Sequence, residues 1–324
     1  MITVRAFDFP IASAIAHVRR QAEGAAPGCV LAVIAATGGP SFRPVGASMI
    51  VMADGTCFGA LSSGCIDGDV AHHAARALQE KTPRKLRYGQ GSPFMDIQLP
   101  CGGSLDIYLM PVPDIFRLEP LESSLGGRRP VVLGLDMARG DISLEAAAQG
   151  DLHLHILPDT RFVIFGAGTE AVAFATMAAA AGYDSVLLSP DADTLGMAQR
   201  QAPGLLTRQI TSATLPEDVV IDRYTAVAMF FHSHDWESEI LGRVLGSEAF
   251  YIGAQGSLRT ATTRIATLRA MGFGEADLDR IKGPIGVIPS TRDPRTLAVS
   301  VLAEVLSHES ATMVDGVAST RLAS

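Results

Sequence analysis

The spacing of apolar residues in the second half of the chain predicts a parallel sheet flanked by helices. From Arg161 onward, short apolar runs typical of buried strands alternate with stretches whose apolar residues recur at helical spacing. The expected strands are 161–165, 184–189, TAVAMFF at 225–231 and the beginning of AFYIGAQGS at 249–257. The expected helices are 170–181, 258–271 with Ser257 as N-cap, and one that begins at Pro294 after the N-cap Asp293.

The first third of the chain has a mixed pattern. Apolar residues at helical spacing predict a helix over residues 10–23, and the run CVLAVIAA is typical of a buried strand. Residues 47–61 predict a hairpin with the two-residue turn Asp54-Gly55. Three glycines and two prolines in residues 37–46 exclude a helix or a central strand there. Further short strands are expected at RKLRYG and SLDIYLMPV.

These elements predict an α/β protein with two domains. The N-terminal domain, residues 1–115, is mixed α+β, and residues 161–309 form a Rossmann-like parallel-sheet domain with C-terminal helices. At 324 residues the chain is long enough to bury two cores. Residues 116–160 are expected to extend the first domain and become the linker, since RRPVVLGLD and LHLHILP could each be strands. Residues 310–324 are expected to form a mobile tail.

Charge and composition narrow the classes of partner. The net charge is −8, with 9 basic and 9 acidic side chains in residues 1–115 against 17 and 25 in residues 116–324. No nucleic acid is therefore expected as a partner. The longest uncharged apolar run is shorter than the roughly 20 residues that span a bilayer, and the N-terminus has no basic segment followed by an apolar one. We expect no membrane segment, a cytoplasmic protein and, as the commonest oligomer, a homodimer.

A glycine turn after the strand 161–165 is typical of a dinucleotide site. Gly166 permits the tight turn, Gly168 lets the backbone approach a phosphate, and small Ala171 allows close packing of helix on strand. An acidic residue about 20 positions further on usually holds the ribose of NAD, but this strand ends at Ser189. Asp191 follows only after a proline, a different geometry. The glycine turn is therefore stronger evidence for a Rossmann-like fold than for an NAD(P) site.

Two further loops follow strands that should end at the same edge of the sheet. GAQGS, with Gly256 and Ser257, leads into a helix with Arg259 in its first turn, an arrangement suited to phosphate. The alternative is that these residues only shape the turn and cap the helix. In HSHD, His234 is a candidate contact to a ligand, since two histidines without a third ligand are weak evidence for a metal site, and none is predicted.

All four cysteines lie in the first third of the chain. They form no CxxC pair, so free thiols are expected rather than disulfides. Cys65, at the beginning of a predicted helix, is a candidate reactive thiol because the helix dipole favours its ionised form, although a small buried residue is the alternative. Cys101, between a proline and two glycines, is the second candidate. Cys29 and Cys57 lie within strands and are expected to be structural.

No catalytic motif of the common hydrolase, zinc or P-loop types is present. The motifs that are present, in their order, resemble the XdhC/CoxI family, the accessory proteins of xanthine dehydrogenase and related molybdenum hydroxylases. The similar stretches are TGGPSFRPVGASMIVMADG, FGALSSGCIDGDV, FVIFGAGTEA, HSHDWESEIL, YIGAQGSLRT and KGPIGV with DPRTLAVSVLAEVL. They lie within residues 28–110 and 161–307.

The resemblance implies a maturation factor that binds molybdenum cofactor, protects it during sulfuration and delivers it to a xanthine dehydrogenase-type apoenzyme, with a cysteine desulfurase as a further partner. It makes Cys65 and Cys101 candidates for contact with the molybdenum centre or for sulfur handling, and the Gly166–Gly168 turn a candidate for a nucleotide or pterin phosphate. Ser63, Thr169 and Ser189 stand where the family usually has glycine, histidine and aspartate. The alternative hypothesis is an NAD(P)-dependent oxidoreductase, with Ser189 tolerating a 2′-phosphate.

Overall fold

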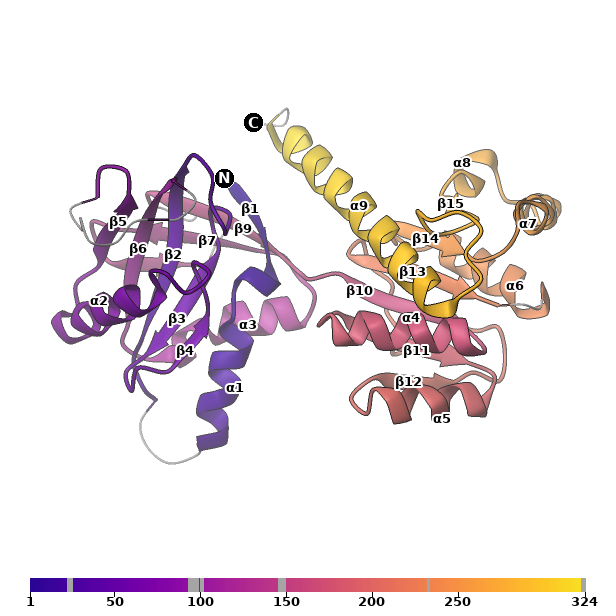
Figure 1. Cartoon of the computed structure of the whole chain (residues 1–324), viewed down its shortest axis with the longest axis horizontal. Coiled ribbons are helices and arrows are strands. Elements are labelled where there is room, and N and C mark those ends of the chain that lie inside the picture. Colours follow the sequence, from indigo (N-terminus) through magenta and orange to yellow (C-terminus); the bar gives the residue numbers. More distant parts are fainter. Residues whose placement is uncertain (22–25, 93–98, 100–101, 145–149, 232–233, 322–324) are drawn as a thin grey trace. The chain divides into compact units, whose positions relative to one another are not determined.

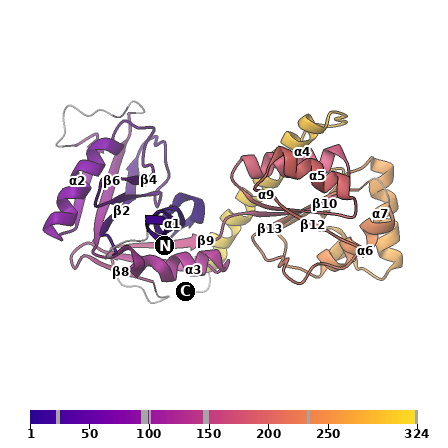
Figure 2. The same ribbon diagram turned by 90° about the horizontal axis from the view of Figure 1, so that it is seen from below.

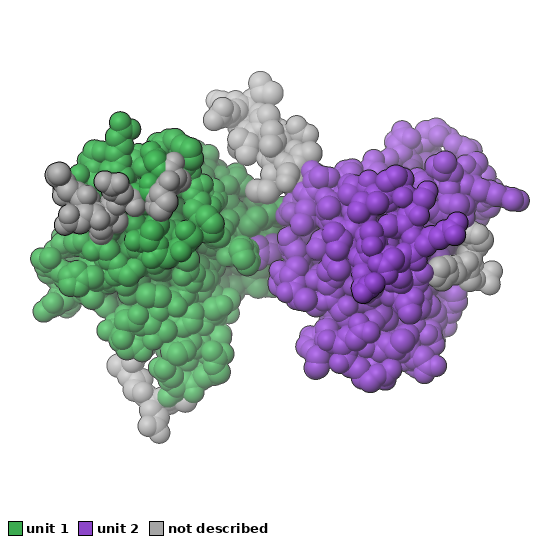
Figure 3. All heavy atoms as spheres, in the orientation of Figure 1, with its two compact units in different colours: residues 1–158 green, residues 159–324 purple. Residues whose placement is uncertain are grey.

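The chain divides into two compact units, Met1–Pro158 and Asp159–Ser324 (Figure 3). The structure is a computed structural model that describes residues 1–21, 26–92, 99, 102–144, 150–231 and 234–321, with the backbone alone at 234, 235 and 310–321. Among these residues no helix has the length and apolar character needed to cross a membrane.

Unit 1 contains a five-stranded antiparallel sheet in the order β4-β3-β2-β6-β5 (Figure 1). The strands are β2 (Cys29–Gly38), β3 (Ser48–Met52), β4 (Cys57–Gly59), β5 (Arg84–Gly89) and β6 (Ser104–Val112). Central β2 is buried on both faces, since Leu31 and Val33 join one apolar cluster whereas Val30 and Ala32 join another beneath helix α2 (Asp67–Glu80). Burial on both faces explains why the run CVLAVIAA is continuously apolar.

The hairpin between β3 and β4 is present, but its turn is longer than predicted. The N–H of Met52 donates to the carbonyl of Thr56 at 2.8 Å, which leaves three residues, Ala53 to Gly55, in the loop. Gly55 has a φ of 87°, the left-handed conformation that a three-residue loop needs at its last position. The predicted two-residue turn was wrong because an Asp-Gly pair suits either loop length.

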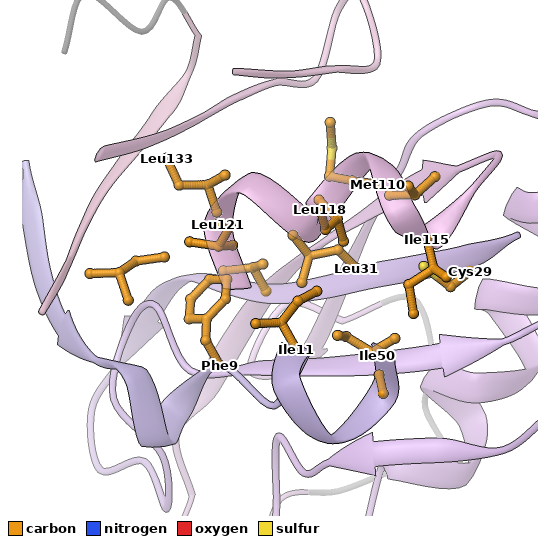
Figure 4. Close-up of a cluster of buried hydrophobic side chains, with 14 of the residues drawn as sticks. Phe9, Ile11, Cys29, Leu31, Ile50, Met110, Ile115, Leu118, Leu121 and Leu133 are labelled. Atoms are coloured by element: carbon orange, nitrogen blue, oxygen red, sulfur yellow. The ribbon is translucent and has the colours of Figure 1, made fainter. Parts of the chain in front are cut away.

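The stretch after β6 forms further structure within unit 1. It contributes η2 (Ile115–Leu118), α3 (Glu119–Gly126), β7 (Val131–Asp136), β8 (Asp141–Ser143) and β9 (Leu152–Leu157). β1 (Ile2–Arg5) pairs in parallel with β9 in a second sheet, β1-β9-β7-β8. After β1 come η1 (Ala6–Asp8) and α1 (Ile11–Gln21). Figure 4 shows Phe9, which follows η1, and Ile11 of α1 packed with Leu121 and Leu133, so residues from both ends of unit 1 share one core.

Unit 2 is built on a six-stranded parallel sheet in the order β12-β11-β10-β13-β14-β15. In chain order this is 3-2-1-4-5-6, the arrangement of Rossmann folds, so the predicted α/β fold class is confirmed. The strands are β10 (Arg161–Gly166), β11 (Asp184–Ser189), β12 (Leu206–Gln209), β13 (Thr225–Phe230), β14 (Tyr251–Ala254) and β15 (Ile281–Lys282).

Helices cover both faces of this sheet. They are α4 (Thr169–Ala180), α5 (Ala192–Gln201), α6 (His234–Leu245), α7 (Leu258–Ala270), α8 (Glu275–Leu278) and α9 (Pro294–Arg321). Figure 2 shows α4 and α5 on one side of the sheet and α6 on the other. Successive strand residues alternate between the faces: Phe162 and Ile164 pack with α4 and α9, while Val163 and Phe165 pack with α6. The last helix continues to Arg321 and so includes most of residues 310–324, for which the sequence predicted a mobile tail.

Candidate functional site

Three of the helices that begin at the carboxyl edge of the parallel sheet follow the loops that the sequence identified, and ligands bind at this edge in open α/β folds. α4 follows β10, α6 follows β13 and α7 follows β14, and these strands are neighbours in the order β10-β13-β14. The strand order reverses between β10 and β13, which marks the crevice at this edge. The fold therefore gathers the glycine turn, the start of α6 and GAQGS at one edge, as the sequence predicted, while His232 and Ser233 of HSHD lie outside the described residues.

The glycine turn owes its first glycine to close strand packing. Gly166 pairs with Phe230, and a Cβ on Gly166 would lie 2.6 Å from the Phe230 carbonyl oxygen. Gly168 is the N-cap of α4, with a φ of 89° that disfavours other residues. Ala171 is fully buried where α4 packs on the sheet. Ala171 thus has the packing role that the sequence predicts, whereas the close approach of Phe230 requires glycine at 166 and the backbone conformation favours glycine at 168.

The hydrogen bonds of this turn are used within the protein. The N–H of Gly168 donates to Thr194 Oγ1 at 2.9 Å, and the Thr194 hydroxyl donates to Asp191. The Glu170 carboxylate, in the first turn of α4, accepts from the Thr169 hydroxyl at 3.1 Å. It also lies 3.7 Å from the position that a Cβ on Gly168 would take. A carboxylate therefore stands beside the turn, where a phosphate would bind.

The residues expected to meet the ribose of a dinucleotide also have structural roles. Ser189 is fully buried, and its hydroxyl accepts from the N–H of Asp191 at 3.1 Å. Asp191 is the N-cap of α5, and its carboxylate accepts from the N–H of Thr194 at 3.0 Å. These hydrogen bonds lower the pKa of Asp191, the Thr194 hydroxyl most of all. Nothing in this geometry supports NAD(P), because the acidic group that would bind ribose caps a helix instead.

The start of α7 is different. Ser257 is the N-cap, and its Oγ accepts from the N–H of Thr260 at 3.1 Å. The N–H groups of Leu258 and Arg259 belong to the first turn of α7 and so have no intrahelical acceptor. Arg259 is exposed there, and the first turn, all of it described, contains no acidic residue. Gly256 has a φ of 146°, and a Cβ on it would lie 2.9 Å from the Thr260 side chain.

Behind this helix start lies a buried ion pair that sequence reasoning missed. Arg264 Nη2 lies 2.7 Å from Glu237 Oε1, with side chains 1% and 2% exposed respectively. The same nitrogen donates to the Gln255 carbonyl at 2.6 Å, which ties the loop before α7 to the pair. Arg264 and Leu268 are the buried residues of α7, four positions apart. A charge on the apolar stripe of a predicted helix was the signal that could have identified it.

In unit 1, Cys65 lies exposed on a turn just before α2. Asp67 Oδ1 accepts from the N–H of Leu61 at 3.1 Å and from the N–H and hydroxyl of Ser62, each at 3.0 Å. Ser62 Oγ in turn accepts from the N–H of Gly64 at 3.0 Å. The turn is therefore fixed by side chains on both sides of the thiol, and of the two interpretations of Cys65 the structure favours the accessible thiol.

The other predicted residues fall into three groups. Cys29 is buried, and burial raises the pKa of its thiol to about 12, with Asp114 adding to the effect. Cys57, expected to be structural, is exposed, and its pKa is raised first by desolvation. Cys101 lies outside the described residues, as does the side chain of His234. In the described part of the chain, no three His, Cys, Asp or Glu side chains are grouped to hold a metal ion.

Comparison with known proteins identifies the family. Residues 162–305 match the XdhC Rossmann domain, and residues 24–89 match the XdhC and CoxI family. The molybdenum cofactor insertion chaperone PaoD of Escherichia coli is 34% identical over 286 residues, which cover 86% of this chain and 83% of PaoD. The chain belongs to the XdhC/CoxI family.

Two more distant comparisons extend over both units. A protein of Bacillus subtilis described as a probable xanthine dehydrogenase subunit is 23% identical over 317 residues, 86% of this chain and 92% of that protein. The crystal structure of a xanthine dehydrogenase from Bacillus halodurans has a TM-score of 0.72 at 23% identity and covers 92% of this chain and 96% of its own. At this identity the crystal structure supports the fold alone.

Two places where this XdhC/CoxI protein departs from the usual family residues are accommodated locally. Ser63 does not have the positive φ that would favour glycine. Serine at this position therefore adds no backbone strain to the turn that contains Cys65. Thr169 donates its hydroxyl to Glu170. Both departures leave the surrounding backbone able to form its turn.

The thiols of this XdhC/CoxI protein should differ in alkylation. We expect iodoacetamide to label Cys65 in the folded protein, because the thiol is exposed. Cys57 should label slowly near pH 7 and faster as pH rises, since its raised pKa keeps it protonated. Cys29 should label only after unfolding. Peptide mass spectrometry with a urea-unfolded control measures this, and labelling of Cys29 in the folded protein would contradict the assignment.

Proposed function

We propose that this protein binds molybdenum cofactor, holds it while a terminal sulfur ligand is installed, and delivers it to a xanthine dehydrogenase-type apoenzyme. The observation that carries the proposal is the 34% identity to a molybdenum cofactor insertion chaperone, which extends over 86% of the chain and so includes both units. A cysteine desulfurase as sulfur source, a homodimer and a cytoplasmic location belong to the same proposal.

The chemistry of the described residues fits such a cargo. Molybdenum cofactor combines a phosphorylated pterin with a metal held by sulfur ligands, so a binding protein needs an anion site and can use a soft ligand near the metal. The start of α7 offers open N–H groups and the cation of Arg259. Cys65 offers an exposed thiol on a fixed turn. The cofactor is cargo here, and no step of its chemistry is assigned to these residues.

Retention of cofactor tests the proposal. Purified protein is mixed anaerobically with excess molybdenum cofactor and desalted, and the retained pterin is measured by mass spectrometry. We expect retention near one cofactor per chain, and Cys65→Ala should lower it severalfold. Cys57→Ala is the matched control, because Cys57 is also exposed but lies in β4. Absence of retention by the unmodified protein would refute the proposal, and equal retention by both variants would remove Cys65 from it.

A further inference from the structure

We infer that the anionic group of the ligand binds at the start of α7, with Arg264 as its buried contact, and not at the glycine turn before α4. The inference rests on the proposed function for the identity of the ligand. It concerns which part of unit 2 holds the phosphate, and it assigns a binding role to an arginine outside the fingerprint residues.

The start of α4 is poorly suited to an anion. The N–H of Gly168, the donor that a glycine fingerprint directs at pyrophosphate, donates to Thr194 Oγ1 at 2.9 Å. The Glu170 carboxylate already occupies the positive end of the α4 dipole and would repel a phosphate. A ligand phosphate would therefore have to break one hydrogen bond and approach a like charge.

The start of α7 offers the opposite environment. Its first turn provides the open N–H groups of Leu258 and Arg259, the positive end of a 13-residue helix and the exposed cation of Arg259. All residues of that turn are described, and none of them is acidic. An anion at this helix start meets the cation of Arg259, whereas an anion at the start of α4 meets the carboxylate of Glu170.

Arg264 is the independent observation that points to a ligand. Its Nη2 serves Glu237 and the Gln255 carbonyl, but Nε and Nη1 have no hydrogen-bond partner among the described residues. Buried arginine donors left unmet are costly and rare in folded proteins. The side chain is 1% exposed, so bulk water does not satisfy them.

Two glycines flank the guanidinium beside the helix start. Nη2 lies 3.4 Å from the position that a Cβ on Gly256 would take, and Nη1 lies 3.1 Å from the corresponding position at Gly283. Neither residue places a side chain against the arginine. Because helical side chains tilt toward the N-terminus, Arg264 directs its donors back to the loop that begins α7. Nη2, which bonds the Gln255 carbonyl, lies beside the loop before α7, and the unmet Nη1 lies beside Gly283 directly after the neighbouring strand β15, so the guanidinium reaches the edge of the sheet at which α7 begins.

The geometry favours a single phosphate group, such as a phosphate monoester. β10 and β14 are separated by one strand, so their ends are about 10 Å apart. The two phosphates of a pyrophosphate share one bridging oxygen and cannot reach both helix starts. Since Glu237 already balances the charge of Arg264, the net attraction comes from Arg259 and the helix dipole. The positive charge of Arg259 and the helix dipole is enough for one phosphate group but not for a diphosphate or triphosphate.

Titration with inorganic phosphate tests the location. Backbone amide NMR of the full chain should show phosphate shifting the amides of Leu258 and Arg259 and leaving those of Thr169 and Glu170 unchanged. By calorimetry, Arg259→Ala should weaken phosphate binding by about tenfold or more, since it removes a charge-assisted contact. Arg269→Ala is the matched control, because it removes the same charge at the other end of α7. Its affinity should change less than twofold.

Two further variants make the result decisive. Arg264→Lys keeps the charge opposite Glu237 but loses the fork of donors, and it should weaken phosphate binding by about tenfold. If that variant does not fold, the amide shifts and Arg259→Ala still decide the location. Glu170→Gln should leave phosphate affinity unchanged. A gain in affinity in Glu170→Gln, or shifts confined to α4, would overturn the inference.

The two proposals fail in different ways. Retention of pterin with phosphate shifts at α4 would refute the α7 location and leave the proposed function standing. Phosphate binding at α7 without pterin retention would refute the function and leave the anion site standing. No phosphate binding at millimolar concentration would overturn the inference.

Discussion

Replacing Glu237 with glutamine should lower the free energy of unfolding of unit 2 by about 3–5 kcal/mol. The substitution leaves the charge of Arg264 uncompensated in a site where both side chains are at least 98% buried. It also weakens the anchor of the loop before α7, because the same guanidinium nitrogen holds the Gln255 carbonyl. The tryptophan Trp236 is partly buried against the core on the α6 face. Its fluorescence during urea unfolding therefore reports this unit.

A surface pair and a double replacement control for this result. Glu248 pairs with Arg223 at 3.1 Å, but both side chains are 67% exposed, so Glu248→Gln should change stability by less than about 1 kcal/mol. Glu237→Leu combined with Arg264→Met removes both charges and should recover most of the lost stability. A cost below about 1 kcal/mol for Glu237→Gln would mean that Arg264 finds another partner.

Replacing Gly166 with alanine should cost about 3 kcal/mol and disturb the glycine turn. The new Cβ would lie 2.6 Å from the Phe230 carbonyl oxygen and 2.8 Å from the Phe230 Cβ. Gly166 and Phe230 are paired residues of neighbouring central strands, so neither backbone can move aside without breaking the ladder. Urea unfolding followed by Trp236 fluorescence measures the loss.

Gly204→Ala is the matched control for this prediction. Nothing lies within 4 Å of a Cβ at Gly204, and its φ is outside the left-handed region. We expect its stability to change by no more than about 0.5 kcal/mol. If the two variants proved equally stable, the close approach of β10 and β13 would not be what requires glycine at position 166.

The sequence predicted much of the fold because its signals are local. Apolar runs and helical spacing located β10, α4, β11 and β13, and Ser257 was identified as the N-cap of α7 by its side-chain chemistry. The same reasoning missed α5 and β12, whose apolar residues are few. It also gave the β3–β4 hairpin a turn one residue too short, because the register of a hairpin depends on pairing across the strands.

The candidate site was predictable only as a set of loops at one edge of a sheet. Gly166, Gly168 and Ser257 could be identified because each stands in a short local pattern, the two glycines in a turn between strand and helix and the serine at an N-cap. The hydrogen bond from Gly168 to Thr194 could not, since the residues are 26 positions apart. The partnership of Arg264 with Glu237 spans 27 positions and depends on how α6 and α7 pack.

The sequence by itself determined the alternation of strands and helices, the family resemblance and the helix starts, because periodicity, capping and glycine turns act over a few residues. Only the tertiary structure decided which helix start has hydrogen-bond donors without a partner. At α4 the folded chain uses Gly168 and places Glu170 beside the turn, whereas at α7 it buries Arg264 with two donors unmet. Hydrogen bonds and charges are shared between distant segments, so their balance exists only once the chain is folded.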